Sequence, residues 1–250
     1  MHLCDPKRPR TFVSFSGIDG AGKSTQITAL SRRLQDLGIR VILIRFWDDV
    51  CRLKTLREST GHTLFKGDKG IGKPEAPIAR KDKNVQSWPM TCVRLVLYFV
   101  DAVSARSSVK RALESDTDFI IYDRYCYDEL ANLNLQNPLI RKYVNLLLRV
   151  VPRLDRSYIL DADPIQARAR KPEYPLDFVY RNRAAYLQLQ NFTGRMTVIL
   201  PMSVDDAERA IWRHTAWDLN LPSGEDTDYF PEQLDKETNL LDTPYTHPAA

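Results

Sequence analysis

The chain has 250 residues, of which 43% are hydrophobic, and a formal net charge of +4. This length and apolar content suit one large α/β domain or two small ones, and exclude a chain too polar to pack a core. The charge is uneven, because residues 52–83 hold nine Lys or Arg against four Asp or Glu, whereas residues 218–250 hold eight acids against one Lys.

Short apolar strands alternate with amphipathic helices along the chain. A first strand at 11–16 precedes a helix at 23–38, in which Ile27, Leu30 and Leu34 recur at helical spacing. A second strand at 39–46 leads into a segment without clear periodicity, and a long helix follows at 91–115. The remaining elements are strands at 118–123, 156–162 and 196–200 and helices at 178–190 and 204–214.

This alternation predicts an α/β protein with a mostly parallel five-stranded sheet and helices on both faces. We expect one domain over residues 11–217, after a flexible N-terminal tail at 1–10. Residues 52–88, rich in Gly, Lys and Pro, are interpreted as a basic, lid-like insertion. Residues 218–250 are expected to form an acidic, mostly disordered tail.

A phosphate-binding loop is predicted between the first strand and the first helix. The stretch "GIDGAGKST" matches the pattern G-x-x-x-x-G-K-[ST] at every fixed position. Glycines let backbone N–H groups approach phosphate oxygens, the lysine reaches the terminal phosphates, and the serine hydroxyl holds Mg²⁺. A strand before the motif and a helix after it provide the required context. The residues expected to bind ATP are Gly17, Asp19, Gly20, Ala21, Gly22, Lys23, Ser24 and Thr25.

The same loop, extended to "GIDGAGKSTQ", resembles the phosphate loop of thymidylate kinases. An Asp-Gly pair inside the loop and a Gln after the Ser-Thr pair are habitual in that family. The resemblance implies a P-loop NTPase fold and a kinase that uses ATP and Mg²⁺. It extends over roughly residues 10–214 and is stronger at the nucleotide end than at the acceptor end.

An Asp-Arg pair ends the strand at 118–123. Asp123 therefore lies at a carboxyl end of the sheet, where open parallel sheets bind ligands, and its carboxylate can hold Mg²⁺ or orient an acceptor. Arg124 can pair with an acceptor phosphate. Thymidylate kinases carry Asp-Arg-Tyr or Asp-Arg-His here, which implies those roles. A pair that only caps the next helix is the structural alternative.

A cluster of cations follows the strand at 156–162. Pro164 starts a short helix that ends in Arg168, Arg170 and Lys171. This segment resembles the arginine-bearing lid of thymidylate kinases, which implies that Arg168 and Arg170 close over the γ-phosphate and act in catalysis by stabilising charge in the transition state. The alternative is a set of ordinary cations at a helix C-terminus.

The acceptor side departs from the thymidylate kinase pattern. By resemblance, Phe99 stacks on the acceptor base; Val103 stands where an arginine is expected, so Arg106 is the candidate substitute. Phe99 can equally be helix core. A group of bacterial thymidylate kinase-like proteins also carries a Trp after the second strand and an "ARK–x–E" lid, matched here by Trp47 and "ARKPE". The expected substrate-binding residues are Arg45, Trp47, Phe99, Arg106 and Arg124.

Together these features predict transfer of the γ-phosphoryl group of ATP to a nucleoside monophosphate, with dTMP as the first choice. Two alternatives stay open: a kinase of another small acceptor, such as a nucleoside or sugar, and an ATP-binding regulatory adaptor whose basic segment meets a protein partner. Nucleic-acid binding through residues 52–83 is not favoured, because acids interrupt the lysines and few aromatic residues lie between them.

The remaining features concern location and assembly. No cysteine pair has CxxC spacing, so neither a zinc site nor a dithiol redox site is predicted, and unpaired thiols suit a reducing compartment. The N-terminal ten residues lack the apolar core of a signal peptide, and the longest apolar run, 95–100, is too short to cross a bilayer. We expect a cytoplasmic protein, and the resemblance implies a homodimer joined through the helix at 91–113.

Overall fold

A computed structural model describes residues 10–51 and 88–221 of the chain. The expected tail at 1–9, nearly all of the basic insertion and the acidic tail from residue 222 onward lie outside the described residues. Among the described helices, none combines the length and the apolar character that crossing a membrane requires.

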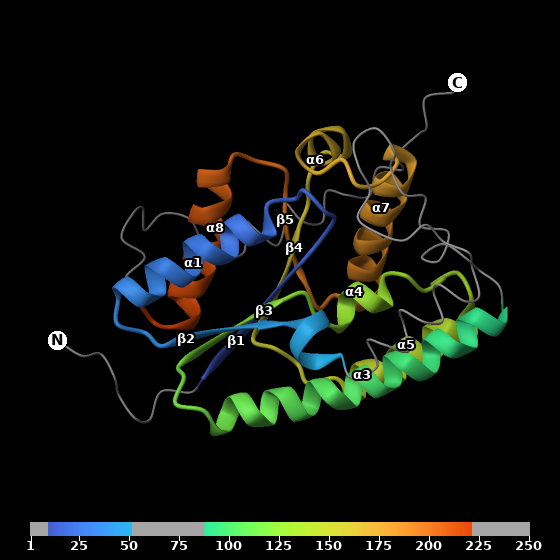
Figure 1. The fold of residues 1–250 in the computed structure, drawn as a ribbon, viewed down its shortest axis with the longest axis horizontal. Helices are drawn as coiled ribbons and strands as arrows, with labels where there is room; N and C mark the ends of the chain where they lie inside the picture. The colour runs from blue at the N-terminus through green and yellow to red at the C-terminus, as the bar shows by residue number, and fades with distance from the viewer. Residues whose placement is uncertain (1–9, 52–87, 222–250) are drawn as a thin grey trace.

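The described strands form one parallel sheet in the order β2-β3-β1-β4-β5. This arrangement confirms the predicted α/β class and the parallel sheet (Figure 1). Each strand lies within the range predicted from its apolar run. The strands are β1 (Thr11–Ser16), β2 (Val41–Arg45), β3 (Phe119–Asp123), β4 (Arg156–Leu160) and β5 (Thr197–Ile199).

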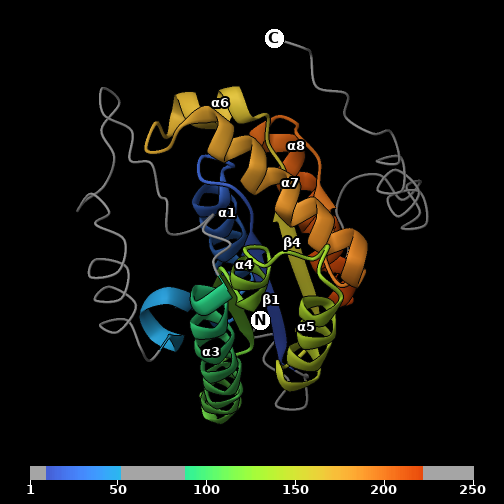
Figure 2. The ribbon, with the colours of Figure 1, turned by 90° about the vertical axis from the view of Figure 1, so that its right-hand side faces the viewer.

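Helices cover both faces of this sheet. The long helices are α1 (Lys23–Asp36), α3 (Trp88–Glu114), α5 (Pro138–Val150), α7 (Leu176–Thr193) and α8 (Val204–Asp218). The short elements are the π-helical turn η1 (Phe46–Val50), α4 (Cys126–Leu130) and α6 (Pro164–Arg170). Figure 1 shows α1 and α8 together on one face, and Figure 2 shows α3 and α5 side by side on the other.

Two buried cores result from the alternation of strand side chains. Val13 and Ile121 face α1 and α8, where they pack with Leu30 and Trp212. Their strand neighbours point to the opposite face, because successive side chains of a strand alternate. There Phe12, Ile120 and Tyr122 pack with residues of α3, α4, α5 and α7.

Helix α5 is the long helix that the sequence analysis does not predict. Its buried residues are Ile140, Val144, Leu147 and Leu148, which follow helical spacing. Asn137 caps it, because its side chain accepts a hydrogen bond from the backbone N–H of Leu139. The pattern and the cap are therefore local signals that were present in the sequence.

The last described helix joins the C-terminal end of the described chain to the sheet. Arg156, at the start of β4, donates hydrogen bonds of 2.8 and 2.7 Å to the carboxylate of Asp218, at the end of α8. The folded part therefore includes Asp218, one residue beyond the domain end expected from the sequence.

Candidate active site

The phosphate loop connects β1 to α1 through three glycines with positive φ. These are Gly17 (φ 134°), Gly20 (φ 83°) and Gly22 (φ 91°). A Cβ atom on Gly17 would lie 2.5 Å from the carbonyl oxygen of Leu160, and one on Gly20 would lie 2.2 Å from that of Ala167. Glycine is required at both positions by conformation and by space. The loop is thus pressed against the end of β4 and against α6.

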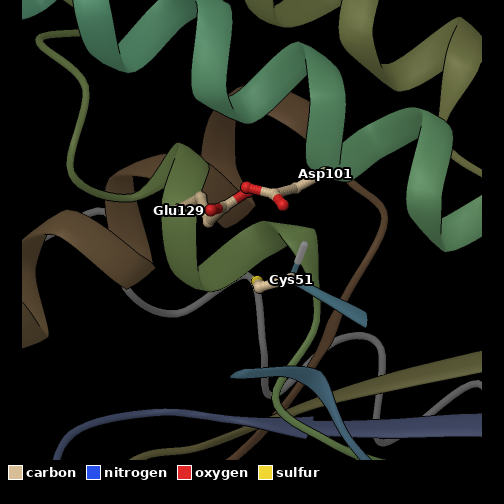
Figure 3. Close-up of side chains that lie close together, drawn as sticks. All are labelled: Cys51, Asp101 and Glu129. Atoms are coloured by element: carbon tan, nitrogen blue, oxygen red, sulfur yellow. The ribbon is translucent and has the colours of Figure 1, made fainter. Parts of the chain in front are cut away.

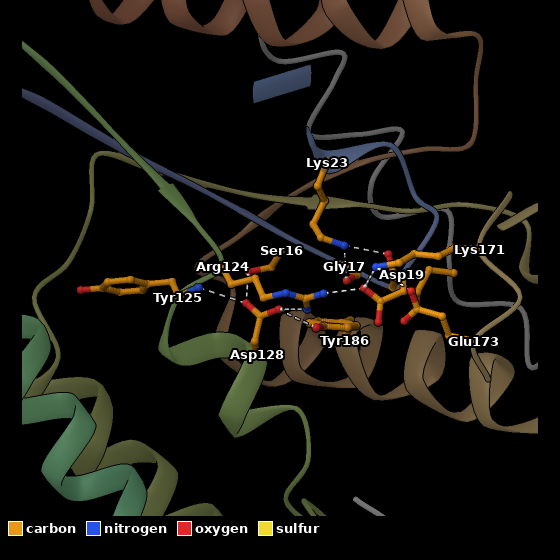
Figure 4. Close-up of polar contacts among 11 residues, drawn as sticks. Ser16, Gly17, Asp19, Lys23, Arg124, Tyr125, Asp128, Lys171, Glu173 and Tyr186 are labelled. Atoms are coloured by element: carbon orange, nitrogen blue, oxygen red, sulfur yellow. Dashed lines mark hydrogen bonds and ion pairs between the residues drawn. The ribbon is translucent and has the colours of Figure 1, made fainter. Parts of the chain in front are cut away.

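Lys23 is buried and its ammonium group lies inside the loop (Figure 4). Nζ donates hydrogen bonds to the carbonyl oxygens of Gly17, at 2.9 Å, and Ile18, at 2.8 Å. Burial and then the nearby charge of Arg124 lower the pKa of Lys23 to about 8, although the carboxylates around it partly oppose this shift. An anionic phosphate in the loop would restore the charged form.

The donor groups suit a triphosphate with magnesium. The first turn of α1 offers backbone N–H groups that have no partner within the helix, together with the exposed hydroxyls of Ser24 and Thr25. Ala21 lies half-buried between the glycines. Hydroxyl and carboxylate oxygens are the ligands that Mg²⁺ prefers, and Ser24 and Asp123 offer one of each.

Asp123 ends β3 at the same edge of the sheet as the loop. In the sheet register it lies beside Phe15 of β1 and Arg45 of β2. Its charge acts on Lys23, and it raises the pKa of that residue. Asp123 is half-buried, whereas the side chain of Arg45 is exposed. The structure therefore brings Asp123 to the predicted site and leaves Arg45 at its rim.

Arg124 bridges the phosphate loop and α4. Its guanidinium donates a hydrogen bond of 2.6 Å to Asp19 of the loop and one of 2.9 Å to Asp128 of α4 (Figure 4). The backbone of Arg124 has a φ of 67°, which is uncommon for a residue other than glycine. Burial disfavours the charged guanidinium, but Asp128, Tyr186 and Asp19 outweigh it and hold the pKa of Arg124 above its ordinary value.

Asp128, Tyr186 and Ser16 are site residues that the sequence analysis missed. The Asp128 carboxylate accepts hydrogen bonds from Arg124, Ser16 Oγ, Tyr186 Oη and the backbone N–H of Tyr125. A signal for Asp128 was present, since it follows Arg124 by four residues, the separation of neighbours on one helix face. Tyr186 and Ser16 lie far from Asp128 in sequence, so no spacing connects them to it.

The three predicted lid cations have different contact partners. Nε of Arg168 donates to the carbonyl oxygen of Tyr174 at 3.1 Å, and Nε of Arg170 donates to that of Gln166 at 3.2 Å. Lys171 instead approaches the loop, because its Nζ lies 3.8 Å from Asp19. Among the described contacts, it is thus Lys171 that links this segment to the phosphate loop, and the catalytic roles of Arg168 and Arg170 stay predictions.

Apart from Arg124, the predicted acceptor residues lie on β2, η1 and α3. Trp47, in η1, is half-buried and packs edge-on against Phe46 with ring centroids 5.3 Å apart. On α3, Phe99 is 44% exposed and Arg106 is also exposed. Within residues 10–51 and 88–221, no contact joins Phe99 or Arg106 to Lys23, so their roles stay predictions as well.

A buried polar cluster lies between η1, α3 and α4. The ligand-type atoms of Cys51, Asp101 and Glu129 all lie within 4.8 Å of one another. Figure 3 shows Asp101 and Glu129 pointing toward each other from their two helices. Glu129 directly follows Asp128, so this acidic pair adjoins the region of Arg124. The sequence patterns predict Mg²⁺ at Ser24 and Asp123 and no metal site at these three residues.

The sequence comparisons point to one group of proteins. No family model matches the chain. A thymidylate kinase of Prochlorococcus marinus (strain AS9601) is 29% identical over 171 residues, which are 66% of this chain and 72% of that protein. A thymidylate kinase of Syntrophotalea carbinolica is 26% identical over 235 residues, which are 85% of this chain and 98% of that protein.

Solved structures share the fold. The crystal structure of thymidylate kinase from Ehrlichia chaffeensis superposes with a TM-score of 0.51 at 21% identity, over 83% of this chain and 99% of that one. Thymidylate kinase from Candida albicans gives a TM-score of 0.53 at 17% identity, over 84% and 93% of the two chains. The matching sequences and the complete phosphate loop make this chain similar to thymidylate kinases, and the solved structures show that it shares their fold.

Proposed function

We propose that the chain transfers the γ-phosphoryl group of Mg·ATP to dTMP. The observation that carries this proposal is the placement of Lys23 inside a complete phosphate loop, with Asp123 and Arg124 at the adjoining strand end. The sequence relatives at 26–31% identity, which are named thymidylate kinases, supply the choice of dTMP.

The donor half of the site is assigned as follows. The amides of the loop and Lys23 bind the phosphate chain of ATP, and Ser24 and Asp123 hold Mg²⁺. The metal ion neutralises charge on the phosphate oxygens when it is bound. Arg168 and Arg170 are proposed to approach the γ-phosphate, and Lys171 is added to them because it already lies near Asp19.

The acceptor half centres on Arg124. A guanidinium has five N–H donors in a planar fork, and Arg124 uses NH1 for Asp128 and NH2 for Asp19. The remaining donors suit the phosphate of the acceptor. Arg45, Trp47, Phe99 and Arg106 complete the proposed acceptor region. In such a site catalysis comes from positioning the two substrates and from neutralising charge, without a covalent enzyme intermediate.

A second candidate acceptor is a small molecule without a phosphate group. The observation that favours it is the half-buried carboxylate of Asp19 of the phosphate loop, which lies beside Arg124. Carboxylates accept hydrogen bonds, so they suit the hydroxyl groups of a nucleoside or sugar better than they suit a phosphate.

The chain is further proposed to form a homodimer in the cytoplasm. Residues Val93, Val96 and Val103 form an exposed apolar face of α3, and contiguous apolar surface of this kind marks protein–protein contacts. A second copy of the chain is the proposed partner, by resemblance to thymidylate kinases. None of the described cysteines forms a disulfide, which suits a reducing compartment.

The decisive experiment is a turnover assay with purified protein and Mg·ATP. The acceptor panel contains dTMP, other nucleoside monophosphates, nucleosides and sugars, and ADP release and the phosphorylated product are both measured. Release of ADP that requires dTMP and yields dTDP supports the proposal. Release that requires a nucleoside or sugar favours the second candidate. Slow ADP release that no acceptor stimulates indicates a regulatory nucleotide-binding protein instead.

A further inference from the structure

The carboxylate of Asp128 accepts hydrogen bonds from four residues. Oδ2 accepts from Ser16 Oγ at 2.6 Å and from the backbone N–H of Tyr125 at 3.1 Å. Oδ1 accepts from Arg124 at 2.9 Å and from Tyr186 Oη at 2.7 Å. The residue is 4% exposed. Every one of these partners is a donor, so a carboxylate fits the site and a group that must also donate does not.

These contacts fix Asp128 from three separate elements. Ser16 ends β1, just before the phosphate loop, and Tyr186 lies on α7, which continues from the lid segment. The backbone N–H of Tyr125 stands at the start of α4 itself. Figure 4 shows the side chains of Ser16 and Tyr186 reaching Asp128, and Arg124 lying between Asp128 and Asp19 of the loop. The position of the carboxylate is therefore set by the fold.

Arg124 depends on this carboxylate for its own position. Its backbone takes a left-handed conformation, which costs free energy in a residue with a Cβ and persists only where the surroundings enforce it. The side chain then spans the space between Asp128 and Asp19, with a hydrogen bond at each end. Without Asp128 the guanidinium would keep only its contact with the loop, and that contact belongs to the donor half of the site.

We infer that Asp128 is a positioning residue that holds the Arg124 fork at the boundary between the donor and acceptor sites. The inference rests on the proposed function insofar as Arg124 receives the acceptor phosphate. Asp128 touches neither substrate in this scheme. It acts through Arg124, and it leaves Lys23 and the loop amides to bind ATP.

Steady-state kinetics of Asp128→Asn test the consequence for the acceptor. The side-chain amide of asparagine would place its N–H donors against the donor groups that bind the Asp128 carboxylate. We therefore expect the KM for the acceptor to rise about tenfold, while the KM for ATP changes less than about twofold. Asp177→Asn is the matched control, because Asp177 is an exposed acid on α7 that pairs only with Arg181 among the described residues. Its kinetics should equal those of the wild type.

A double-mutant cycle separates positioning from general structural support. If Asp128 acts through Arg124, adding Asp128→Asn to Arg124→Ala should change the acceptor KM by less than about twofold beyond Arg124→Ala alone. A residue that merely supports the fold would instead give effects that multiply. Multiplying effects, or equal changes in the two KM values, overturn the inference.

Arginine side-chain NMR of the protein without substrates gives a readout that needs no turnover. The Nη1–H signal of Arg124, the group that donates to Asp128, is assigned by its absence in Arg124→Lys. In the wild type we expect slow solvent exchange of this proton, and in Asp128→Asn a shifted signal with at least about tenfold faster exchange. An unchanged signal overturns the inference. If the wild type phosphorylates no acceptor, the proposed function fails, while this measurement still decides the positioning role.

A second variant covers the case in which Asp128→Asn does not fold. Tyr186→Phe removes only the donor that shares Oδ1 with Arg124 and preserves the ring in the core. It should raise the acceptor KM about threefold and accelerate exchange of the Arg124 proton, without changing the KM for ATP. If Tyr186→Phe leaves both the acceptor KM and the exchange rate unchanged, the inference is overturned.

Discussion

The guanidinium of Arg183 donates two hydrogen bonds of 2.6 Å to the carboxylate of Asp161. Asp161 follows β4 directly and its side chain is 2% exposed, whereas Arg183 lies on α7. The pair therefore joins the end of a central strand, beside the phosphate loop, to the helix that also carries Tyr186. Because the pair is buried, removing one partner should lower the free energy of unfolding strongly.

Removing Arg183 should destabilise the protein strongly. Arg183→Ala leaves the buried Asp161 carboxylate without its bidentate partner, and we expect a loss of about 3 kcal/mol in the free energy of unfolding. Arg181→Ala is the control on the same helix, because its pair with Asp177 is exposed and should contribute less than about 0.5 kcal/mol. Urea denaturation measures both values, and equal losses would contradict the role of burial.

Gly20→Ala should disrupt the phosphate loop. The new methyl group would lie 2.2 Å from the carbonyl oxygen of Ala167, in addition to the strain of a φ of 83°. Gly194→Ala is the control, since its φ is 60° and no atom lies within 4 Å, so it should cost only about 1 kcal/mol of left-handed strain. Calorimetry should show weakened ATP binding for Gly20→Ala alone. Similar thermal stability and ATP affinity in both variants would contradict the close contact with α6.

Binding of Mg·ATP should take up protons near pH 8. Lys23 has a pKa of about 8, and phosphate oxygens around its ammonium group should raise that pKa. The expected uptake is therefore about half a proton at pH 8 and about a tenth at pH 7. Calorimetry in two buffers of different ionisation enthalpy measures it. Lys23→Arg is the control, because a guanidinium stays protonated, and uptake that persisted in this variant would assign the effect to another group.

The same shift has a consequence for stability. The pKa of Lys23 is lower in the folded protein than the 10.5 of an ordinary lysine, so the unfolded chain binds more protons between about pH 8 and 10.5. The contribution of Lys23 to the free energy of unfolding therefore becomes more favourable as the pH rises through this window. The difference in unfolding free energy between the wild type and Lys23→Met should change in that direction.

Arg124→Ala should raise the KM for the acceptor much more than the KM for ATP. We expect the KM for the acceptor to rise between about tenfold and a hundredfold, because charge-assisted hydrogen bonds are lost, while the KM for ATP rises less than about threefold. Arg149→Ala, an exposed arginine on α5, is the control for removing a cation. Equal effects on both KM values would count against the acceptor role of Arg124.

The exposed apolar face of α3 should control the oligomeric state. Val96 is 65% exposed at the centre of this face, and Val96→Glu should convert a dimer into a monomer, because a desolvated carboxylate at the seam has no partner. Leu146→Glu places the same charge on an exposed apolar position of α5 and should leave the dimer intact. Sedimentation velocity measures the mass, and a monomeric wild type would refute the proposed dimer.

The sequence by itself determined the elements whose signals are local. Strand length, helical spacing and the loop motif predicted the parallel sheet and the position of Lys23 and Ser24, because those patterns depend on neighbours a few residues apart. The strand end also placed Asp123 beside the loop, since the carboxyl ends of parallel strands share one edge. Helix α5 had the same kind of local pattern and was open to prediction.

Only the tertiary structure decided the partners of Arg124. Ser16 and Asp128 are 112 residues apart, and Tyr186 lies 58 residues beyond Asp128, so neither spacing nor periodicity connects them. The orientation of α3, which leaves Phe99 exposed, was likewise set by packing. A sequence motif predicts which groups can bind phosphate. The carboxylates that orient those groups are brought there by the packing of the helices on the sheet, which depends on the whole chain.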